Sequence, residues 1–552
     1  MCAANPAPTA DVLIVGAGPT GLTLGIELAR RNVPFMLIER DAARPTTSRA
    51  IGLQTRTAEM LQILGIPRSA LQPSLRPRAV CLEEGQRTLA CITFDAADTD
   101  GVMLTIIDET DTERILQARL EALGGVVQRG TELLSYREEG DGVTATLRDA
   151  DGEREVRARY LVGADGAHSL VRRAAGIPFE GSAYPEQFIL ADLDLEWGLP
   201  HDTGHVWIGG EQLAAVLPLP AANRYRVILP LAPAVVLPAN PSEAEIGDLA
   251  IELLRERTGV RLKVQGAPVW ASAFRISRRQ ASQYRKGPVF LAGDAAHVHS
   301  PVGGQGMNTG IQDACNLGWK LALATKGQAA PGLLDTYFAE RAPIAHDLLR
   351  NTDLATRAVL SQNDLMREVR RHVIPVLASS PRVRQRLMPV VGQLNVNYRG
   401  SFLAVDAGAA RRRRSGLLAG DRVPDQELQT AAGDPVRLYD LVAQGWTLLL
   451  FAGADATPER QRALRDLAGV SQSVVGDAVH PVRVVPTPTD NVAGSITLLD
   501  AHGEVATRLG ASAGLAVLVR PDGYLGYRGA LEDTGAFASY LARVFAMRMV
   551  GA

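Results

Sequence analysis

The chain has 552 residues, of which 46% are hydrophobic and 21% are charged, and its formal net charge is -2. This length predicts roughly three to four domains, and the composition is ordinary for a soluble globular protein. The near-neutral charge argues against nucleic acid or an anionic membrane as a partner. We expect no membrane span, because no apolar run reaches the length that a bilayer requires.

The four cysteines are Cys2, Cys81, Cys91 and Cys315. They include no C-x-x-C pair and no metal-ligand spacing, so the sequence predicts neither a disulfide framework nor a metal site. The N-terminus has no basic region ahead of an apolar core, as a signal peptide would. Both observations favour a reducing cytoplasm as the location.

A nucleotide-binding pattern opens the chain. The apolar run at 11–15 predicts a strand, GAGPTG follows at 16–21, and the leucines and isoleucine of 22–28 predict a helix. The next apolar run, at 35–38, ends at Glu39. A G-x-G-x-x-G between a strand and a helix, with an acidic residue further on, is typical of a dinucleotide-binding site.

The three glycines of that pattern have separate tasks. Gly16 makes the tight turn, Gly18 lets a pyrophosphate approach, and Gly21 permits close packing of helix on strand. Glu39 is placed to accept hydrogen bonds from the ribose hydroxyls of adenosine. The pattern predicts a dinucleotide but leaves FAD and NAD both open.

The segment that follows favours FAD. Arg49, in the run 48–56 ahead of a helix, is placed to contact a pyrophosphate or a flavin ring, although a solvated arginine at a helix start is the alternative. A further helix is expected to begin at Thr112, with this threonine as its cap. Asp151-Gly152 then predicts a hairpin between two alternating strands.

A second ligand-binding pattern lies at 285–320. An apolar run at 289–292 predicts a strand that stops at Gly293-Asp294; a loop rich in glycine and proline follows, and helical spacing begins at Asn308. An aspartate at a strand end can bind sugar or ribityl hydroxyls, and glycines let backbone N–H groups approach a ring. A helix N-terminus stabilises negative charge on a reduced flavin. The unit therefore suits a flavin, and an ordinary strand–loop–helix is the alternative.

Three separated motifs together resemble those of the flavoprotein aromatic hydroxylases, the single-component monooxygenases related to p-hydroxybenzoate hydroxylase and phenol hydroxylase. They are GAGPTG with Glu39, D-G-x-x-S-x-x-R from Asp165 to Arg172, and G-D-A-A-H-x-x-x-P-x-G-G-x-G-M-N from Gly293 to Asn308. LLDTYFAERAPIA, at 333–345, is also similar to this family. The nearest branch is that of the enzymes that oxidise polyketides or aromatic antibiotics.

The resemblance implies an α/β fold: a Rossmann-type FAD-binding domain with an inserted β-sheet substrate domain, plus a C-terminal thioredoxin-like α/β domain. Residues 1–178 and 276–400 would form the FAD-binding part with its long helices, and 179–275 the substrate sheet. Residues 401–552 would form the thioredoxin-like domain. That domain lacks redox cysteines, because no cysteine follows Cys315, so we expect a structural role or an oligomer interface.

The resemblance also implies the cofactor contacts. Asp165 belongs to an element that serves both FAD and NADPH, Asp294 would bind the ribityl chain, and the loop 301–308 would lie against the isoalloxazine. Relatives carry glutamine where Glu109 stands, and a carboxylate near a diphosphate is unfavourable unless it turns away or pairs with an arginine. The expected cofactor-binding set is Gly16, Ala17, Gly18, Pro19, Thr20, Gly21, Glu39, Arg40, Arg49, Glu109, Leu133, Asp165, Gly293, Asp294, Pro301, Gly304, Gly306, Met307 and Asn308.

The sequence names no catalytic base. Arg49, His205 and Arg226 are candidates for orienting a phenol or carboxylate. Apolar residues of the middle region are candidates for a flat cavity, with plain sheet core as the alternative: Phe188, Leu190, Trp207, Val216, Leu217 and Val227.

By the same resemblance the chain is an FAD-dependent monooxygenase. NADPH or NADH would reduce the flavin, dioxygen would add to give a flavin 4a-hydroperoxide, and a phenolic, polycyclic substrate would be hydroxylated. Two alternatives stay open: Baeyer–Villiger oxygenation of a related ketone, and a non-catalytic flavin-binding protein. We expect no metal, no nucleic acid and no membrane as partner, and a monomer or homodimer.

Overall fold

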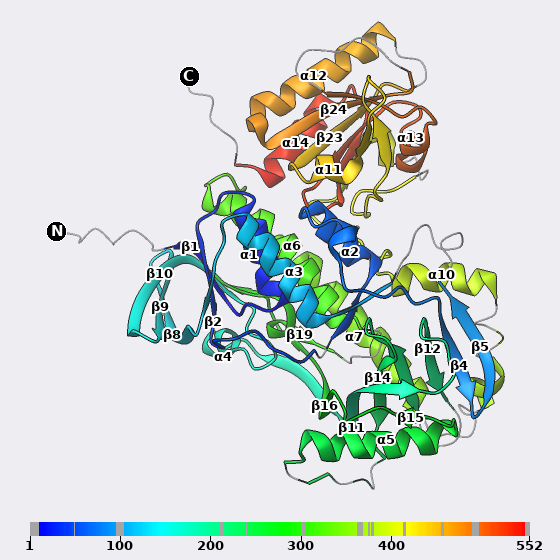
Figure 1. The fold of residues 1–552 in the computed structure, drawn as a ribbon. Coiled ribbons are helices and arrows are strands. Elements are labelled where there is room, and N and C mark those ends of the chain that lie inside the picture. The colour runs from blue at the N-terminus through cyan, green and yellow to red at the C-terminus, as the bar shows by residue number, and fades with distance from the viewer. Residues whose placement is uncertain are drawn as a thin grey trace.

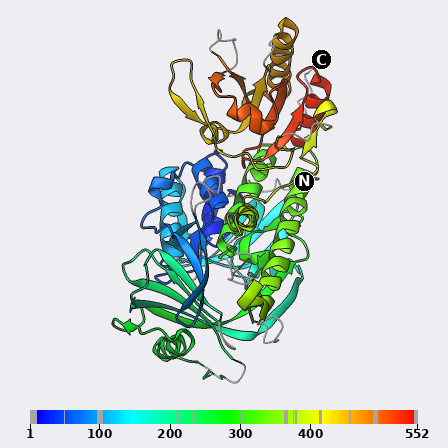
Figure 2. The ribbon, with the colours of Figure 1, turned by 90° about the vertical axis from the view of Figure 1, so that its right-hand side faces the viewer.

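The computed structural model describes residues 10–546 apart from 49, 95–103, 209–212, 233–234, 236, 239, 300–303, 361–367, 374–375, 377–379, 412–415, 454–456 and 488–495. Three large sheets organise these residues, and each has its own covering of helices (Figure 1). The first lies in the middle of the molecule, the second at one end with α5 beneath it, and the third at the opposite end (Figures 1 and 2). Among the described residues no helix combines the length and the apolar character needed to cross a membrane.

The first sheet carries the nucleotide pattern. Its parallel centre runs β18 (Val289–Leu291), β10 (Gly152–Gly163), β1 (Ala10–Val15), β2 (Phe35–Glu39) and β7 (Val127–Arg129). Strands covered on both faces read as continuous apolar runs, which is why β1 and β18 were visible in the sequence. The helices α1 (Pro19–Ala29), α3 (Glu109–Ala122) and α6 (Gly306–Thr325) lie side by side next to it (Figure 1).

The expected hairpin is confirmed, because β9 (Gly142–Asp149) pairs antiparallel with β10 and also with β8 (Glu132–Glu139). The expected start of α3 is wrong. The helix begins at Glu109 with Asp108 as its N-cap residue. Thr112 lies one turn inside, where its hydroxyl donates to the Asp108 carbonyl at 3.1 Å. A threonine bonds the preceding turn in this way as readily as it caps, so the residue type did not fix the boundary.

The second sheet is mainly antiparallel. Its order is β19 (His297–Val298), β16 (Trp270–Ala281), β11 (Phe179–Glu196), β14 (Arg224–Pro230), β13 (Ala214–Pro218), β12 (Thr203–Trp207), β4 (Ala79–Glu84) and β5 (Arg87–Thr93), with β15 (Lys263–Val264) beside β11. Two of these strands, β4 and β5, come from well before residue 179. Helix α5 (Glu243–Thr258) covers one face of this sheet. The sequence predicted a β-sheet domain here but not this helix. A capping box at Ser242 and Glu245 starts it.

The second sheet also corrects the expectation for the cysteines. Cys81 on β4 and Cys91 on β5 are paired residues of an antiparallel hairpin, with their Cα atoms 4.0 Å apart, and they form a disulfide. The spacing rules failed here because strand register, and not separation along the chain, brings the two sulfur atoms together. Cys315 is a buried free thiol on α6.

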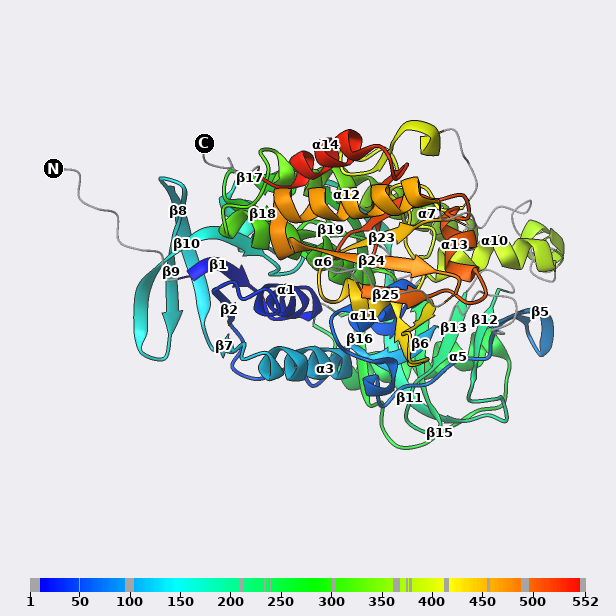
Figure 3. The same cartoon turned by 90° about the horizontal axis from the view of Figure 1, so that it is seen from above.

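The third sheet builds the C-terminal unit, residues 405–546. Its order is β20 (Val405–Asp406), β27 (Leu525–Gly529), β26 (Leu515–Val519), β23 (Trp446–Phe451), β24 (Val479–Val485), β25 (Ile496–Leu499), β21 (Glu427–Gln429) and β22 (Pro435–Arg437). Helices α12 (Pro458–Val475) and α14 (Thr534–Val544) pack on one face, as the view from above shows (Figure 3). Helices α11 (Leu438–Val442) and α13 (Glu504–Leu509) pack on the other. The expected strand–helix alternation is confirmed.

A buried ionic cluster joins the C-terminal unit to the rest of the chain. Glu340 on α7 (Thr336–Leu360) accepts hydrogen bonds from Lys320 Nζ at 2.8 Å and from the Arg520 guanidinium at 2.6 and 2.9 Å. Arg520 also pairs with Asp522, whose Oδ2 accepts the Trp319 indole N–H at 3.1 Å. All four ionic side chains have 0% exposure. Burial alone would raise the pKa of Glu340, but the two cations outweigh it and hold that pKa far below its ordinary value.

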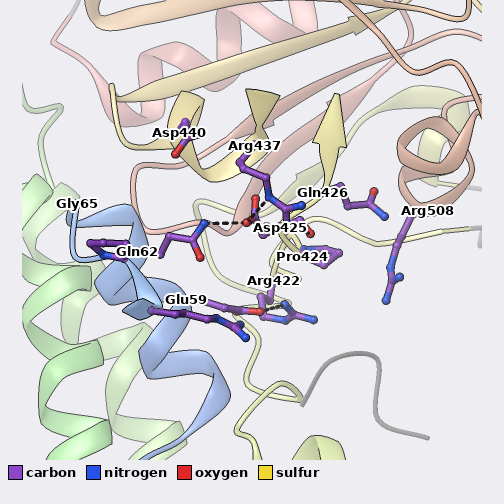
Figure 4. Close-up of a pocket in the computed structure, with 12 residues that line it drawn as sticks. Glu59, Gln62, Gly65, Arg422, Pro424, Asp425, Gln426, Arg437, Asp440 and Arg508 are labelled. Atoms are coloured by element: carbon purple, nitrogen blue, oxygen red, sulfur yellow. Dashed lines mark hydrogen bonds and ion pairs between the residues drawn. The ribbon is translucent and has the colours of Figure 1, made fainter. Parts of the chain in front are cut away.

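A polar cavity of about 770 Å³ lies beside this junction, between α2 (Thr55–Ile63) and the C-terminal unit (Figure 4). Two bonds cross between its walls: Arg422 to Glu59 at 2.6 Å and Gln62 to Asp425 at 2.9 Å. The C-terminal unit is therefore fixed to α2 and to α6 and α7 by hydrogen bonds as well as by packing.

Candidate functional site

The nucleotide loop, residues 16–21, is shaped by close backbone contacts. Gly16 has φ +101°, and a Cβ there would lie 2.4 Å from the Ala164 carbonyl oxygen. A Cβ on Gly21 would lie 1.9 Å from the Gly16 carbonyl oxygen, which is far inside van der Waals contact. Above Gly18 the space is open, and the nearest atom to a Cβ there would be Glu113 Oε1 at 3.9 Å. The turn and the packing need two of the glycines, and the third leaves room for a ligand.

Helix α1 presents its N-terminus to that space. No side chain of the described residues caps it, and its first turn holds no acidic residue. Its first backbone N–H groups and its dipole therefore remain available to an anion, which is the arrangement that binds a pyrophosphate. Glu39, at the end of β2, accepts the Ala17 N–H through Oε2 at 2.9 Å, so it lies at the edge of the same loop. Arg40 beside it is largely exposed.

The Asp165 motif is a helix-capping device. Asp165 Oδ2 accepts the N–H groups of Leu170 and Val171 at 2.7 and 3.2 Å at the start of α4 (Leu170–Ala174). Ser169 Oγ accepts the Arg172 N–H at 2.9 Å. The Arg172 guanidinium then donates to the Ala295 carbonyl at 2.8 Å. The spacing D-G-x-x-S-x-x-R thus ties α4 to the turn that follows β18.

That turn is a single 3-10 turn, Gly293–Ala295, in which Asp294 is exposed while its neighbours are buried. A side chain must be exposed to reach a ligand, so Asp294 is suitably placed to bind hydroxyl groups. Its position depends on Asp313 of α6, whose Oδ2 accepts the Gly293 N–H at 3.1 Å and contacts His297 Nε2 at 2.7 Å. Asp313 Oδ1 accepts from Arg341 Nε at 2.6 Å.

Sequence reasoning missed Asp313. It is fully buried, and although burial would raise its pKa, attraction to His297 and Arg341 outweighs burial and lowers it. The available signal was an acidic residue among the apolar positions of α6, between Ile311 and Ala314. A buried carboxylate of this kind needs partners, and the LLDTYFAERAPIA segment supplies one in Arg341.

The glycine loop leads directly into α6. The N-terminus of α6 has neither a side-chain cap among the described residues nor an acidic residue in its first turn. Asn308 is buried, accepts the Gln54 N–H at 2.9 Å and donates to the carbonyls of Gly52 and Gly304 at 3.1 and 2.9 Å. This side chain therefore holds the loop against β3 (Ile51–Leu53). Met307 packs at the edge of the core.

Other expected cofactor residues have different surroundings. Leu133 on β8 is 4% exposed and is part of the hydrophobic core. Glu109 Oε2 accepts the Ala50 N–H at 3.0 Å, and the Glu109 N–H donates to Ser48 Oγ at 2.9 Å. The start of α3 thereby holds residues 48 and 50 on either side of Arg49. Arg49 and Pro301 lie outside the described residues.

Arg226 connects the second sheet to that same segment. Its guanidinium donates twice to Asp192 at 2.7 Å and once to the Ser48 carbonyl at 2.7 Å, and it lies 5.4 Å from the Trp270 ring centroid. Asp108 lies close enough to be influenced electrostatically by Arg226; burial, the largest effect, raises the Asp108 pKa. This face of the sheet therefore looks toward segment 48–53 and the start of α3.

His205 lies on the other face. In the sheet register it pairs with Val216, which pairs with Val227, and both valines pack in the core cluster beneath α5. His205 Nδ1 contacts Glu83 Oε1 at 2.9 Å, and the His205 ring lies among the rings of Trp197 and Trp207. The structure therefore does not bring His205 and Arg226 together.

Register also divides the six apolar candidates. Trp207, Val216 and Val227 pack toward α5, so for these three the sheet-core interpretation holds. On the Arg226 face are Leu217, which pairs with Arg226, and Leu190, which pairs with Ile228. Phe188 is on this face too, with its ring 6.2 Å from that of Phe274. A surface that combines apolar side chains with the buried Arg226–Asp192 ion pair thus faces the nucleotide-binding half of the molecule.

These features are those of a dinucleotide-binding site in a flavoprotein. Among the described residues they are an uncapped helix N-terminus at Gly18, a second uncapped helix N-terminus after the glycine loop, and the exposed side chain of Asp294. FAD fits this set of donors and this open space. Residues 9–352 match the family model of the FAD binding domain, and residues 417–547 match that of the aromatic-ring hydroxylase C-terminal domain.

Similar proteins agree along nearly the whole chain. Pentachlorophenol 4-monooxygenase of Sphingobium chlorophenolicum is 34% identical over 538 residues, which cover 96% of this chain and 95% of that protein. The solved structure of OxyS anhydrotetracycline hydroxylase from Streptomyces rimosus is 32% identical, with a TM-score of 0.75 over 97% of this chain and 99% of that one. Aklavinone-11 hydroxylase, solved in a ternary complex with FAD and aklavinone, is 27% identical, with a TM-score of 0.75 over 98% and 99% of the two chains.

The chain belongs to the family of FAD-dependent aromatic-ring hydroxylases. It is a flavoprotein monooxygenase that acts on aromatic rings, as the motifs at Gly16, Asp165 and Gly293 indicated.

Proposed function

We propose that this monooxygenase uses NADPH or NADH and dioxygen to hydroxylate a phenolic ring of a polycyclic, polyketide-like substrate. The substrate would lie on the Arg226 face of the second sheet, opposite segment 48–53. The observation that carries the proposal is that this face combines the apolar side chains of Leu190, Leu217 and Ile228 with the Arg226–Asp192 ion pair, and connects to the cofactor segment through the bond from Arg226 to Ser48.

The names of similar proteins support the substrate class. Anhydrotetracycline and aklavinone are the compounds in the names of two of the solved structures described above. A flat polycyclic ring suits a sheet face whose side chains stand perpendicular to it. A flat face also removes water from both the ring and the cofactor, which an oxygen transfer requires.

When FAD is bound, it supplies the activated oxygen, and the protein supplies binding, orientation and exclusion of water. The N-termini of α1 and α6 would hold the diphosphate and the pyrimidine side of the flavin, and Asp294 the ribityl hydroxyls. Arg226 is paired with Asp192, so its proposed part is to set the position of Ser48 beside Arg49. The absence of a second G-x-G-x-x-G is consistent with a nicotinamide that meets the flavin without a domain of its own.

The proposed layout is a Rossmann-type FAD-binding domain around the first sheet, an inserted substrate domain around the second, and a thioredoxin-like domain around the third. Parallel strands with crossover helices support the first assignment. Helices on both faces of the third sheet support the last. In that unit the buried cluster at Glu340 and Arg520 supports a structural role.

The test of the reaction is anaerobic stopped-flow of the FAD-loaded protein with NADPH and, separately, NADH, with and without a polycyclic phenol. Acceleration of flavin reduction by the phenol, followed by a product carrying one ¹⁸O atom on a ring carbon from ¹⁸O₂, is expected. A product with the oxygen inserted into a C–C bond would show that the reaction is a Baeyer–Villiger oxygenation and not a hydroxylation. If neither NADPH nor NADH reduces the flavin, the proposal that a nicotinamide nucleotide is the reductant is wrong.

Two isoleucines on neighbouring strands provide a matched pair for the binding face. Ile228 is on the Arg226 face, whereas Ile189 is fully buried toward α5. Ile228→Ala should raise KM, or change the position of hydroxylation, with little loss of stability. Ile189→Ala should lower stability by about 2–5 kcal/mol while leaving KM unchanged. The reverse pattern would place the substrate elsewhere.

A further inference from the structure

The carboxylate of Glu113 lies next to the open space at Gly18. Glu113 lies on α3, one turn after Glu109, and is 6% exposed. Its Oε1 is the atom nearest to where a Cβ on Gly18 would lie, at 3.9 Å. Within the part of the chain that the structure describes, no hydrogen bond or ion pair engages this carboxylate. It is a buried polar group aimed at the place where a diphosphate would approach the N-terminus of α1.

The charges around Glu113 make its ionised form costly. Burial is the largest effect and raises its pKa to about 7, and the carboxylates of Glu109 and Glu39 raise it as well. Arg129 on β7 and Arg44 after β2 act in the opposite direction but do not outweigh them. The arrival of a diphosphate would add further negative charge to a site that already holds three carboxylates.

We propose that Glu113 binds the FAD diphosphate as a neutral carboxylic acid, donating its proton in a hydrogen bond to a phosphate oxygen. This inference rests on the proposed position of FAD at the nucleotide loop. An ionised carboxylate has only acceptors and would repel a phosphate, whereas the protonated group has a donor. Loading of the cofactor is therefore coupled to uptake of one proton from solvent at this residue.

The coupling has a definite sign. Below about pH 6 Glu113 is protonated before FAD arrives, and the FAD Kd should not depend on its titration. Above about pH 7 the proton has to be taken up on binding, so the Kd should increase by roughly tenfold per pH unit. At pH 8 the protein should take up close to one proton for each FAD bound.

The experiment measures FAD binding to apoprotein, by quenching of flavin fluorescence from pH 6 to 9. Calorimetry at pH 8 in buffers of different ionisation enthalpy counts the protons. Glu113→Gln keeps an N–H donor and cannot titrate, so its Kd should lack the tenfold slope and its proton uptake should vanish. Glu121→Gln, an exposed position on the same helix, should behave as the wild type.

A wild-type Kd that stays constant from pH 7 to 9, or no proton uptake at pH 8, would overturn the inference whether or not the variant folds. A Glu113→Gln protein that keeps both the slope and the uptake would overturn it too. A wild-type protein that binds no FAD at any pH would instead overturn the position of the cofactor, and so separates the two proposals.

Discussion

Removing the charge of Glu340 should weaken the attachment of the C-terminal unit to α6 and α7. Glu340 accepts five hydrogen bonds, from Lys320, Arg520 (twice), Asn316 and Ser401. Glu340→Gln conserves the shape but leaves two buried cations facing the single carboxylate of Asp522. Breaking a buried pair by removing one partner costs on the order of 3–5 kcal/mol. At roughly 2–4 °C per kcal/mol for a domain of this size, Tm should fall by about 6–20 °C.

The assay is thermal unfolding followed by tryptophan fluorescence, because a tryptophan pair spans the junction. Trp319 on α6 and Trp446 on β23 lie edge to face, with their ring centroids 5.2 Å apart. The variant should lose this native fluorescence ahead of the far-UV circular dichroism of the whole chain. Glu532→Gln, an exposed position of the same unit, serves as the control and should change stability by less than about 0.5 kcal/mol.

A second substitution tests the cause. Burial lowers the pKa of Lys320 to about 8, so this lysine is easily neutralised. Replacing it with methionine in the Glu340→Gln background removes one unpaired cation, and part of the lost stability should return. If Glu340→Gln melts within about 2 °C of the wild type, or if the second substitution deepens the loss, the argument from buried charge is refuted.

Two further predictions concern the site and the disulfide. Asp313→Asn should weaken FAD retention and cost about 3–5 kcal/mol at neutral pH. Because the folded-state pKa of Asp313 is lowered, this stability is complete above its unfolded pKa near 4 and is lost progressively as the pH falls from there through the folded pKa. In urea unfolding of wild type and variant at pH 7 and pH 3, the difference in stability should therefore shrink by roughly 1 kcal/mol in acid, and a difference that stays constant would contradict the assignment. Cys81→Ser with Cys91→Ser should cost about 2–3 kcal/mol, in the lower part of the usual range for a disulfide, because the bond closes a short loop. Wild type in dithiothreitol should match the double variant, and thiol titration of the unfolded, oxidised wild type should find two of the four cysteines; four would refute the bond.

Local sequence patterns predicted the parts of this protein whose geometry depends on neighbours in the chain. Gly16, Gly18 and Gly21 are spaced for one turn and one close helix–strand contact, and the structure shows both. The apolar runs of β1, β18 and β23 predicted buried strands, because a strand that is covered on both faces has no polar positions. The three motifs also identified the family, since their order and wide separation along the chain match its pattern.

The same patterns did not predict what each motif residue contacts. Asp165 caps α4 and Asn308 holds the glycine loop, although both match the motif of a flavin site. Each makes hydrogen bonds to backbone groups that the sequence does not locate. A motif residue can thus act by holding a loop of the site through bonds to its backbone. The spacing alone does not distinguish this role from direct contact with the cofactor.

Only the tertiary structure decided which face of the second sheet each residue occupies. From the sequence, His205 and Arg226 were equal candidates for orienting a substrate. Strand register puts them on opposite faces of the sheet, because side chains alternate with a period of two. Register also joins Cys81 to Cys91. Asp313, Glu113 and Glu340 acquire their importance from partners or surroundings contributed by other elements, often far away in the chain. The sequence by itself determined the family, the cofactor class, and the strands and helices that flank the motifs. The assembly of distant segments in a low-dielectric interior decided which buried charges contribute to stability and binding.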